Sequence, residues 1–234
     1  GGGGGRLYEH TNNTHPLNFT IPFYAWGKGV TAGADLYALN ADTRTSPDAD
    51  ENPVYTGESA TQPIRNGAIA NLSAKLLGLG AVPGSWINSS QDLSLGSSGT
   101  VSHVIAISVD GLRSGDIDKL GAEELPNLFR FRNEGAFTDN ARTDYFITRT
   151  LPNHSSMLTG RGSLDVTGVG IGHNQEMNHD SGDTLHDNIG AYMHGIFDVA
   201  KDAGLRTALF ANKSKFNLLN RTWDGSWKDS GGDN

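Results

Sequence analysis

The feature that most constrains the fold is a short apolar run at residues 101–109 (VSHVIAISV), which ends directly at Asp110 and Gly111. Its length and its β-branched residues predict a strand covered on both faces, as in a parallel sheet. Because ligand sites gather at the carboxyl ends of such strands, Asp110 is well placed to hold a metal ion at the rim of the sheet. The alternative is an aspartate that caps the following turn, and position alone leaves both interpretations open.

Strand and helix patterns alternate along the rest of the chain, around a polar stretch at residues 42–60 that predicts a surface loop. Strands are predicted at residues 18–26, 136–141 and 205–211, and helices at residues 62–79, 125–133, 152–159 and 189–203. Such alternation predicts an α/β fold in which helices cover both faces of a mostly parallel central sheet.

The composition excludes several kinds of site and partner. The chain has no cysteine, so disulfides and thiolate metal sites are excluded, and any metal must bind His, Asp, Glu or hydroxyl groups. The net charge of −8 offers no basic surface for non-specific nucleic-acid binding. No apolar run approaches the roughly 20 residues of a membrane-spanning helix, so no membrane segment is predicted.

A second candidate for chemistry is Thr150, which ends an extended stretch and precedes Leu151-Pro152-Asn153-His154. A proline at this spacing favours the start of a helix, whose free N–H groups and dipole favour an anion. A hydroxyl there can attack phosphorus if a metal ion lowers its pKa. The alternative is an ordinary N-cap threonine, which is a common use of the residue.

The histidines and glycines add little by themselves. None of the eight histidines forms a short zinc-binding spacing such as HExxH, and each one alone is better explained as a surface or structural residue. The glycines at positions 168, 170 and 172 lack the preceding strand that a dinucleotide site requires. The residues alone therefore indicate a hydrolase-like or phosphate-handling α/β domain.

Two motifs considered together are more specific. Residues 107–113 (ISVDGLR) and 150–154 (TLPNH) resemble the two opening motifs of the nucleotide pyrophosphatase/phosphodiesterase branch of the alkaline phosphatase superfamily. Residues 125–128 (LPNL) resemble the helix between these motifs, and Thr159-Gly160 the end of the short helix after the second. The resemblance implies an alkaline-phosphatase-like three-layer α/β/α sandwich and a metal-dependent phosphodiesterase or phosphatase.

The resemblance also implies roles for individual residues. Asp110 would be a ligand of one zinc ion, and Thr150 would bind the same ion and attack phosphorus, forming a phosphothreonine intermediate. Asn174, in a Gly-His-Asn stretch, would hydrogen-bond a phosphate oxygen and stabilise the transition state. Residues 203–216 look like the next strand of a bacterial subgroup. One departure is Val169, where the family has a histidine.

The N-terminal part resembles the opposite end of the same family. Residues 9–11 (EHT), 18–27 and 62–79 look like the C-terminal metal histidine, the last strand and the last helix of the domain. His10 would then be a ligand of the second of two zinc ions, with His15 as the alternative.

In this chain, the part that resembles the C-terminal end of the family domain therefore comes before the part that resembles its N-terminal end. We divide the chain into residues 1–87, which resemble the C-terminal end, a linker at 88–100, and residues 101–234, which resemble the N-terminal part with the nucleophile. The middle of the family domain, which carries further Asp and His ligands, has no counterpart. We expect an incomplete or permuted fold and impaired or absent zinc-dependent turnover, because each zinc ion takes about four ligands.

Two functions follow from this resemblance. The first is a zinc-dependent phosphoric-ester hydrolase that acts through Thr150 on small phosphodiesters or nucleotides. The second is a non-catalytic superfamily member that lacks several metal ligands. A sulfatase is disfavoured, because sulfatases use a Cys or Ser nucleophile in a different motif. The resemblance implies a secreted or periplasmic location and leaves the substrate, the leaving group and self-association undetermined.

Overall fold

The computed structural model describes residues 12–55, 62–97, 99–163, 184–189 and 191–221. This part of the chain has a mixed α/β fold, as the sequence predicts, with helices around a small open sheet. Its elements in chain order are α1 Pro16–Phe19, β1 Thr20–Ala25, β2 Ala34–Asp35, η1 Ala38–Asn40, α2 Ala68–Leu76, α3 Ser114–Glu124, α4 Pro126–Glu134, β3 Ala136–Arg142, α5 Thr150–Thr159, α6 Leu185–Ile189, α7 Ile196–Asp202, η2 Ser214–Phe216 and α8 Asn217–Arg221.

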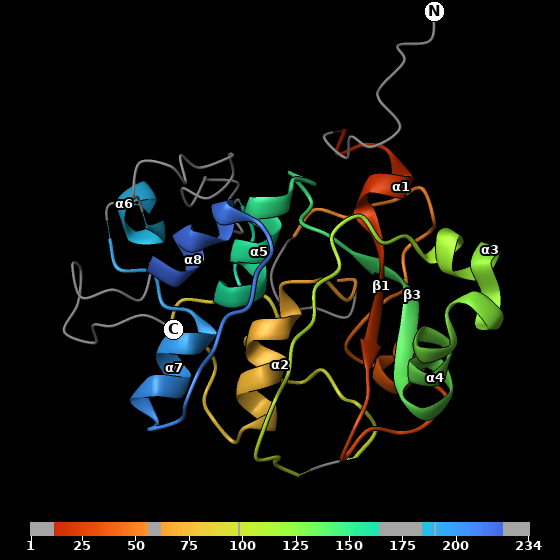
Figure 1. Ribbon diagram of the computed structural model, residues 1–234, viewed down its shortest axis with the longest axis horizontal. Helices are drawn as coiled ribbons and strands as arrows, with labels where there is room; N and C mark the ends of the chain where they lie inside the picture. The colour runs from red at the N-terminus through yellow and green to blue at the C-terminus, as the bar shows by residue number, and fades with distance from the viewer. Residues whose placement is uncertain (1–11, 56–61, 98, 164–183, 190, 222–234) are drawn as a thin grey trace, which may run out of the picture.

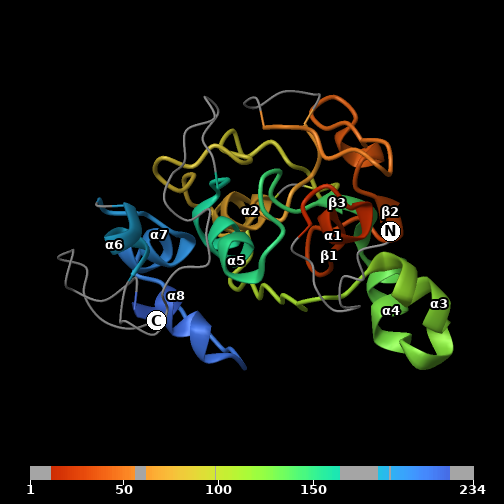
Figure 2. The ribbon, with the colours of Figure 1, turned by 90° about the horizontal axis from the view of Figure 1, so that it is seen from above.

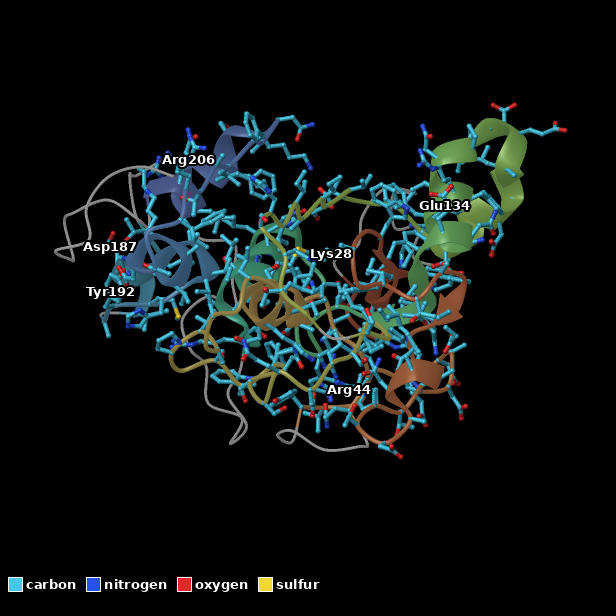
Figure 3. All side chains as sticks on the ribbon, turned by 90° about the horizontal axis from the view of Figure 1, so that it is seen from below. Lys28, Arg44, Glu134, Asp187, Tyr192 and Arg206 are labelled. Carbon is cyan, nitrogen blue, oxygen red and sulfur yellow. The ribbon has the colours of Figure 1, made fainter. Side chains whose placement is uncertain are left out.

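The elements follow one another from one end of the molecule to the other. Figure 1 shows α3 and α4 at one end, then the strands, then α2 and α5, and finally α6, α7 and α8. The view from above keeps the same order, with helices on both sides of the sheet (Figure 2). Figure 3 marks the two ends by Glu134, at the end of α4, and by Tyr192, beyond α6.

The sheet has three strands in the order β1-β3-β2. β1 runs antiparallel to β3, from the pair Thr20 and Arg142 to the pair Ala25 and Ala136, and β2 joins β3 in parallel. The predicted strands at 18–26 and 136–141 are therefore confirmed as β1 and β3. The longer strand pair is antiparallel, so the predicted three-layer sandwich with a mostly parallel sheet is not confirmed.

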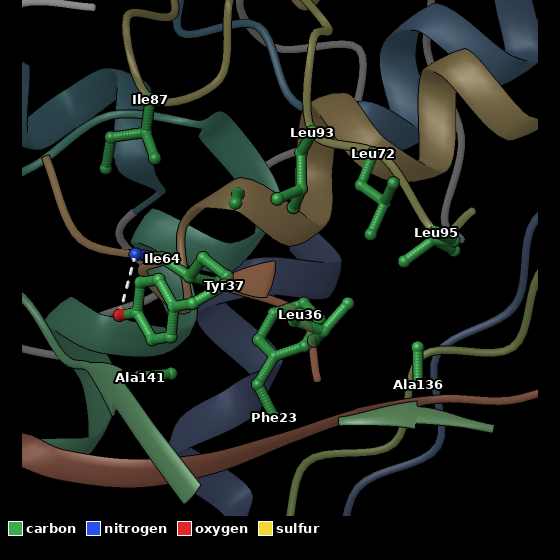
Figure 4. Close-up of a cluster of buried hydrophobic side chains, with 11 residues drawn as sticks. Phe23, Leu36, Tyr37, Ile64, Leu72, Ile87, Leu93, Leu95, Ala136 and Ala141 are labelled. Atoms are coloured by element: carbon green, nitrogen blue, oxygen red, sulfur yellow. Dashed lines mark hydrogen bonds between the residues drawn. The ribbon is translucent and has the colours of Figure 1, made fainter. Parts of the chain in front are cut away.

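The main core fills the space between this sheet and α2 (Figure 4). Leu36 and Ile64 are completely buried in it, and the Ile64 amide donates a hydrogen bond to the Tyr37 hydroxyl at 3.1 Å. Leu93 and Leu95 also pack in this core, so this part of the predicted linker is buried. The predicted domain boundaries themselves stay a prediction.

The predicted helices are present, although two are shorter than expected. The segments 125–133 and 152–159 are confirmed as α4 and α5, whereas the segment 62–79 is helical only in α2. Within the segment 189–203, the predicted longer helix is reduced to α7, which spans only Ile196–Asp202. The described part of the predicted loop at 42–60 contains neither helix nor strand, as expected.

Two predicted buried strands are wrong. The segments 101–109 and 205–211 belong to no strand, and most of their apolar side chains are exposed. Ile105 is 84%, Ile107 73% and Phe210 93% exposed. The sequence pattern of a covered strand is therefore present in these two segments, but the apolar cover that it predicts is missing over most of their side chains.

The reason lies in what a buried strand requires. Such a strand needs a hydrogen-bonded neighbour and apolar cover, because unpaired backbone groups are costly to remove from water. Among the described residues, no backbone hydrogen bond joins residues 102–108 to another segment. In Figure 1 both segments run toward the top of the molecule, where α5 begins. They end at the site described next.

Candidate active site

Helix α5 begins at Thr150, directly after the extended residue Arg149, which is its N-cap. The interpretation of Thr150 as an N-cap threonine is therefore wrong, and no side chain caps this end of the helix. At the other end, Gly160 adopts a left-handed conformation with φ of 65° and stops the helix. The start of α5 leaves its first N–H groups without helical partners, which suits an anion.

Asn153 fixes the start of this helix with its side-chain amide. Its Oδ1 accepts hydrogen bonds from the Asp144 amide at 2.9 Å and from Asn66 Nδ2 at 2.8 Å. Its Nδ2 donates to the carbonyls of Ile147 at 2.7 Å and Arg149 at 2.9 Å. All four positions of a buried amide are therefore satisfied. The asparagine of the TLPNH motif thus positions the loop that carries Thr150.

Asp144 reinforces the same loop from the opposite side. Its Oδ1 accepts hydrogen bonds from the amides of Phe146 and Ile147, at 2.8 Å and 3.1 Å. Both of its carboxylate oxygens also bind Ser163, which follows α5. A buried carboxylate that accepts several hydrogen bonds stabilises its surroundings and stays in place. The backbone before Thr150 is therefore held by two buried side chains.

The structure brings the two predicted residues Asp110 and Thr150 together. The Thr150 hydroxyl donates a hydrogen bond of 3.2 Å to Oδ2 of Asp110, which lies 40 residues earlier in the chain. Lys213 Nζ lies 2.5 Å from the same carboxylate oxygen and forms an ion pair with it. Sequence reasoning missed Lys213, because nothing in the sequence links position 213 to position 110.

His154 joins the Asp110 segment to α5. Its Nδ1 donates to the Thr150 carbonyl at 2.7 Å, which leaves Nε2 to accept a hydrogen bond of 2.9 Å from the Ser108 hydroxyl. The ring also packs against Phe216, with 4.7 Å between ring centres. Burial lowers the pKa of His154, so the neutral ring that this pattern requires is favoured. The i, i+4 spacing from Thr150 was the signal that could have indicated this contact.

The charges around Thr150 favour an anionic ligand. The negative charge of Asp110 is paired with Lys213, and the positive charge of Lys215 lies near enough to lower the pKa of His154 after the effect of burial. Together with the helix N-terminus, these two lysines add positive charge near the start of α5. A phosphate ester is a suitable ligand for such a site.

Of the remaining predicted site residues, only His15 is among those that the structure describes. His10 and Asn174 lie outside the described residues. His15, the alternative to His10, caps α1 by accepting a hydrogen bond of 3.2 Å from the Leu17 amide. Within the described ranges, no three His, Asp or Glu side chains are grouped so that they could hold a metal ion.

A comparison with known families matches the part of the chain that carries this site. A family model described as type I phosphodiesterase/nucleotide pyrophosphatase matches residues 104–219, which include Asp110, Thr150 and Lys213. This segment belongs to that family. Type I phosphodiesterases are hydrolases of phosphoric esters within the alkaline phosphatase superfamily, and the chain is therefore of the hydrolase class. No curated protein and no solved structure matches the chain.

The segment that matches the type I phosphodiesterase family, residues 104–219, is only part of the described structure. The region before it contributes β1, α2 and Asn66, which binds Asn153 at the start of α5. The permuted order of the two family parts stays a prediction. No described helix combines the length and the apolar character needed to cross a membrane.

Proposed function

We propose that this chain hydrolyses small phosphodiesters or nucleotides by attack of Thr150 on phosphorus. The observation that carries the proposal is the hydrogen bond from the Thr150 hydroxyl to Asp110, made at the start of α5 within the type I phosphodiesterase segment. A nucleophilic hydroxyl next to a carboxylate acceptor has the arrangement that proton transfer requires.

The reaction would proceed in two steps. The Thr150 oxygen forms a bond to phosphorus while the bond from phosphorus to the leaving-group oxygen breaks, and the threonine proton passes to Asp110. The departing oxygen takes up a proton from solvent. Water then bonds to phosphorus while the bond from phosphorus to the threonine oxygen breaks. Asp110 returns its proton to the Thr150 oxygen, and the phosphoric acid product releases one proton of the water to solvent. The first amides of α5 have no helical partners and would hydrogen-bond the developing negative charge, to which Lys213 and Lys215 would add positive potential.

Asn174 completes this proposal by hydrogen-bonding a non-bridging phosphate oxygen. The support for its role is the resemblance of its Gly-His-Asn stretch to the family. A secreted or periplasmic location is likewise proposed from the resemblance alone.

Zinc fits the described residues poorly. Asp110 and Thr150 offer oxygen donors, but a zinc ion takes about four ligands, and Lys213 already contacts Oδ2 of Asp110. His10, the proposed ligand of a second ion, lies outside the described residues. The two zinc ions that the resemblance implies stay a prediction. The proposed reaction therefore uses only groups of the chain and water.

The alkaline-phosphatase-like sandwich, incomplete or permuted, remains the proposed architecture of the full domain. The family match supports it, as does the presence of helices on both sides of the sheet in Figure 2.

The proposal is tested by hydrolysis of bis(p-nitrophenyl) phosphate. We expect Thr150→Ala to lose about a thousandfold or more in rate, because it removes the nucleophile. Thr150→Ser keeps a hydroxyl and should retain part of the activity. Thr31→Ala, at an exposed threonine between β1 and β2, is the matched control and should react at the parental rate. Mass spectrometry of acid-quenched reactions should detect a phosphoryl group on the peptide that contains Thr150.

Two outcomes would contradict this proposal. Hydrolysis by Thr150→Ala at the parental rate would exclude Thr150 as the nucleophile. A parental protein that is folded by circular dichroism but shows no turnover, with or without added zinc, would favour the second function. The chain would then be a non-catalytic superfamily member.

A further inference from the structure

Asn66 contacts the start of α5, although it lies outside the segment that matches the family. Its Nδ2 donates a hydrogen bond of 2.8 Å to Oδ1 of Asn153, 87 residues later in the chain. Asn66 is 2% exposed and Asn153 5%, so solvent cannot replace either partner if the other is lost. This buried contact links the nucleophile loop to a part of the chain that precedes the family segment.

The backbone of Asn66 is fixed against the end of β3. The Asn66 amide donates to the Arg142 carbonyl at 3.0 Å, and the Arg142 amide donates to the Ile64 carbonyl at 2.9 Å, which makes a parallel bridge between the two segments. Two residues after β3, the Asp144 amide donates to the same Oδ1 of Asn153 at 2.9 Å. One oxygen of Asn153 is therefore held by donors from two segments that are hydrogen-bonded to each other.

One orientation of the two side-chain amides satisfies all of these contacts. Asn66 Oδ1 accepts a hydrogen bond of 2.8 Å from the Gly67 amide, so Asn66 Nδ2 is the atom that faces Asn153. Asn153 Nδ2 donates to the carbonyls of Ile147 and Arg149, so Asn153 Oδ1 must face donors. An acceptor at position 66 would face the Asn153 oxygen or reverse its amide. Reversal would break both bonds to the backbone before α5.

We propose that Asn66 is a positioning residue, which acts through Asn153 to hold Thr150 in place for attack on phosphorus. This role rests on the proposed attack by Thr150. The contacts run from Asn66 through Asn153 to the carbonyl of Arg149, which is the N-cap of α5. Because a displacement of about 1 Å can cost about a hundredfold in rate, loss of the donor at position 66 should lower kcat.

The Asn66→Asp variant tests this role with almost no change of shape. At neutral pH the introduced carboxylate is an acceptor, so kcat for bis(p-nitrophenyl) phosphate should fall about tenfold or more, with KM unchanged. Burial and the facing oxygen should raise the pKa of the introduced carboxyl. As the pH falls through this pKa, the protonated carboxyl can donate, so kcat relative to the parental chain should recover. Asn66→Ala provides no donor at any pH and should not recover.

Hydrogen exchange provides a measurement that needs no turnover. By mass spectrometry, the peptide that spans residues 144–153 should exchange about tenfold faster in Asn66→Asp than in the parental chain at neutral pH. The difference between the two proteins, compared at equal pH, should shrink as the introduced carboxyl is protonated. Each variant keeps the same charged and titratable neighbours, which are Arg65, Arg142, Asp144 and His154. The comparison therefore isolates the introduced carboxyl.

Asn40→Asp is the matched control. Asn40 is 4% exposed, and its Nδ2 donates to the carbonyls of Leu36 and Ser94 at 2.7 Å and 2.9 Å. The control therefore also turns a buried amide donor into an acceptor, but at η1. It should unfold more easily than the parental chain, yet keep the parental kcat and the parental exchange of residues 144–153. All rates are compared where circular dichroism shows each protein to be folded.

Parental exchange of residues 144–153 in Asn66→Asp at every pH would overturn this role for Asn66. The same loss of kcat and the same faster exchange in Asn40→Asp would overturn it too, as would a change confined to KM. If Asn66→Asp does not fold, Asn66→Ala is compared with Asn40→Asp in both measurements. A parental chain without turnover would contradict the proposed function, and the exchange of residues 144–153 would then decide alone whether Asn66 positions the loop.

Discussion

The core between the sheet and α2 and the segments that lead to the site are built in opposite ways. Leu36 and Ile64 are fully buried, whereas Ile105 and Ile107 have similar side chains that lie mostly in water. The core is held by apolar packing. Residues 101–110, here called the site segment, are held by polar contacts: Ser108 and Asp110 bind side chains of α5, and Asp110 also binds Lys213.

This difference separates stability from function. Burial of apolar side chains contributes most of the folding free energy, whereas partly exposed ion pairs contribute little. The free energy of unfolding should therefore depend on the core and respond weakly to changes in the site segment. Three measurements, in decreasing order of expected effect, test this separation.

The largest effect is expected for Leu36→Ala in the core. The change removes a fully buried side chain and leaves a cavity, so the free energy of unfolding should fall by about 2–5 kcal/mol. Urea unfolding followed by tryptophan fluorescence measures the loss. A decrease of less than about 1 kcal/mol would show that this core is loosely packed and would remove the contrast with the site segment.

A smaller effect, visible only as a dependence on pH, is expected from Asp198 on α7. This carboxyl is 4% exposed and hydrogen-bonds Tyr192 and the Gly195 amide. Burial raises its pKa to about 6, whereas an unfolded aspartate has a pKa of about 3.9. The folded state therefore binds the proton more tightly, and Asp198 should lower the stability progressively as the pH rises from about 4 to about 6.

The Asp198→Asn variant measures that contribution. Over this pH range, the Asp198 carboxyl should lower the free energy of unfolding of the parental chain by up to about 3 kcal/mol. The variant should not show this decrease. Urea unfolding of both proteins at several pH values between 4 and 7 gives the comparison, in which all other titrating groups are shared. Parallel curves for the two proteins would contradict the raised pKa.

The smallest effect is expected for Ile107→Ser in the site segment. The side chain is 73% exposed, so the free energy of unfolding should change by no more than about 0.5 kcal/mol. Urea unfolding again measures the free energy of unfolding, and Leu36→Ala is the reference for a buried residue. A loss above about 2 kcal/mol would mean that the segment is covered in solution, as the sequence pattern predicts.

Local patterns predicted the helices α4 and α5 and the strands β1 and β3, because their periodicity and end signals lie within each segment. The resemblance, which rests on the combination of two motifs, assigns Asp110 and Thr150 to one zinc ion; the structure brings the two side chains together, and the zinc ion stays a prediction. The burial of residues 101–109 was predicted wrongly, because an apolar run indicates a preference for cover and says nothing about which segment supplies it.

The other site contacts could not be predicted for a related reason. Lys213 lies 103 residues from Asp110, and Asn66 lies 87 residues from Asn153, so no local periodicity connects them. Contacts of this kind depend on tertiary packing. Without an alignment of related sequences, a single chain provides no signal for them.

The anchoring of α5 has a consequence for how this family segment can be inherited. The Gly160 carbonyl accepts hydrogen bonds from the amides of Trp86 and Ile87, and Asn66 binds Asn153 at the other end of the helix. A side chain at Gly160 would collide with Asn71 and Ser85. All of these partners precede residue 104, so the segment that matches the family does not contain all the contacts of α5. A gene fragment that encodes only residues 104–219 would lack the earlier residues that contact α5 at its two ends.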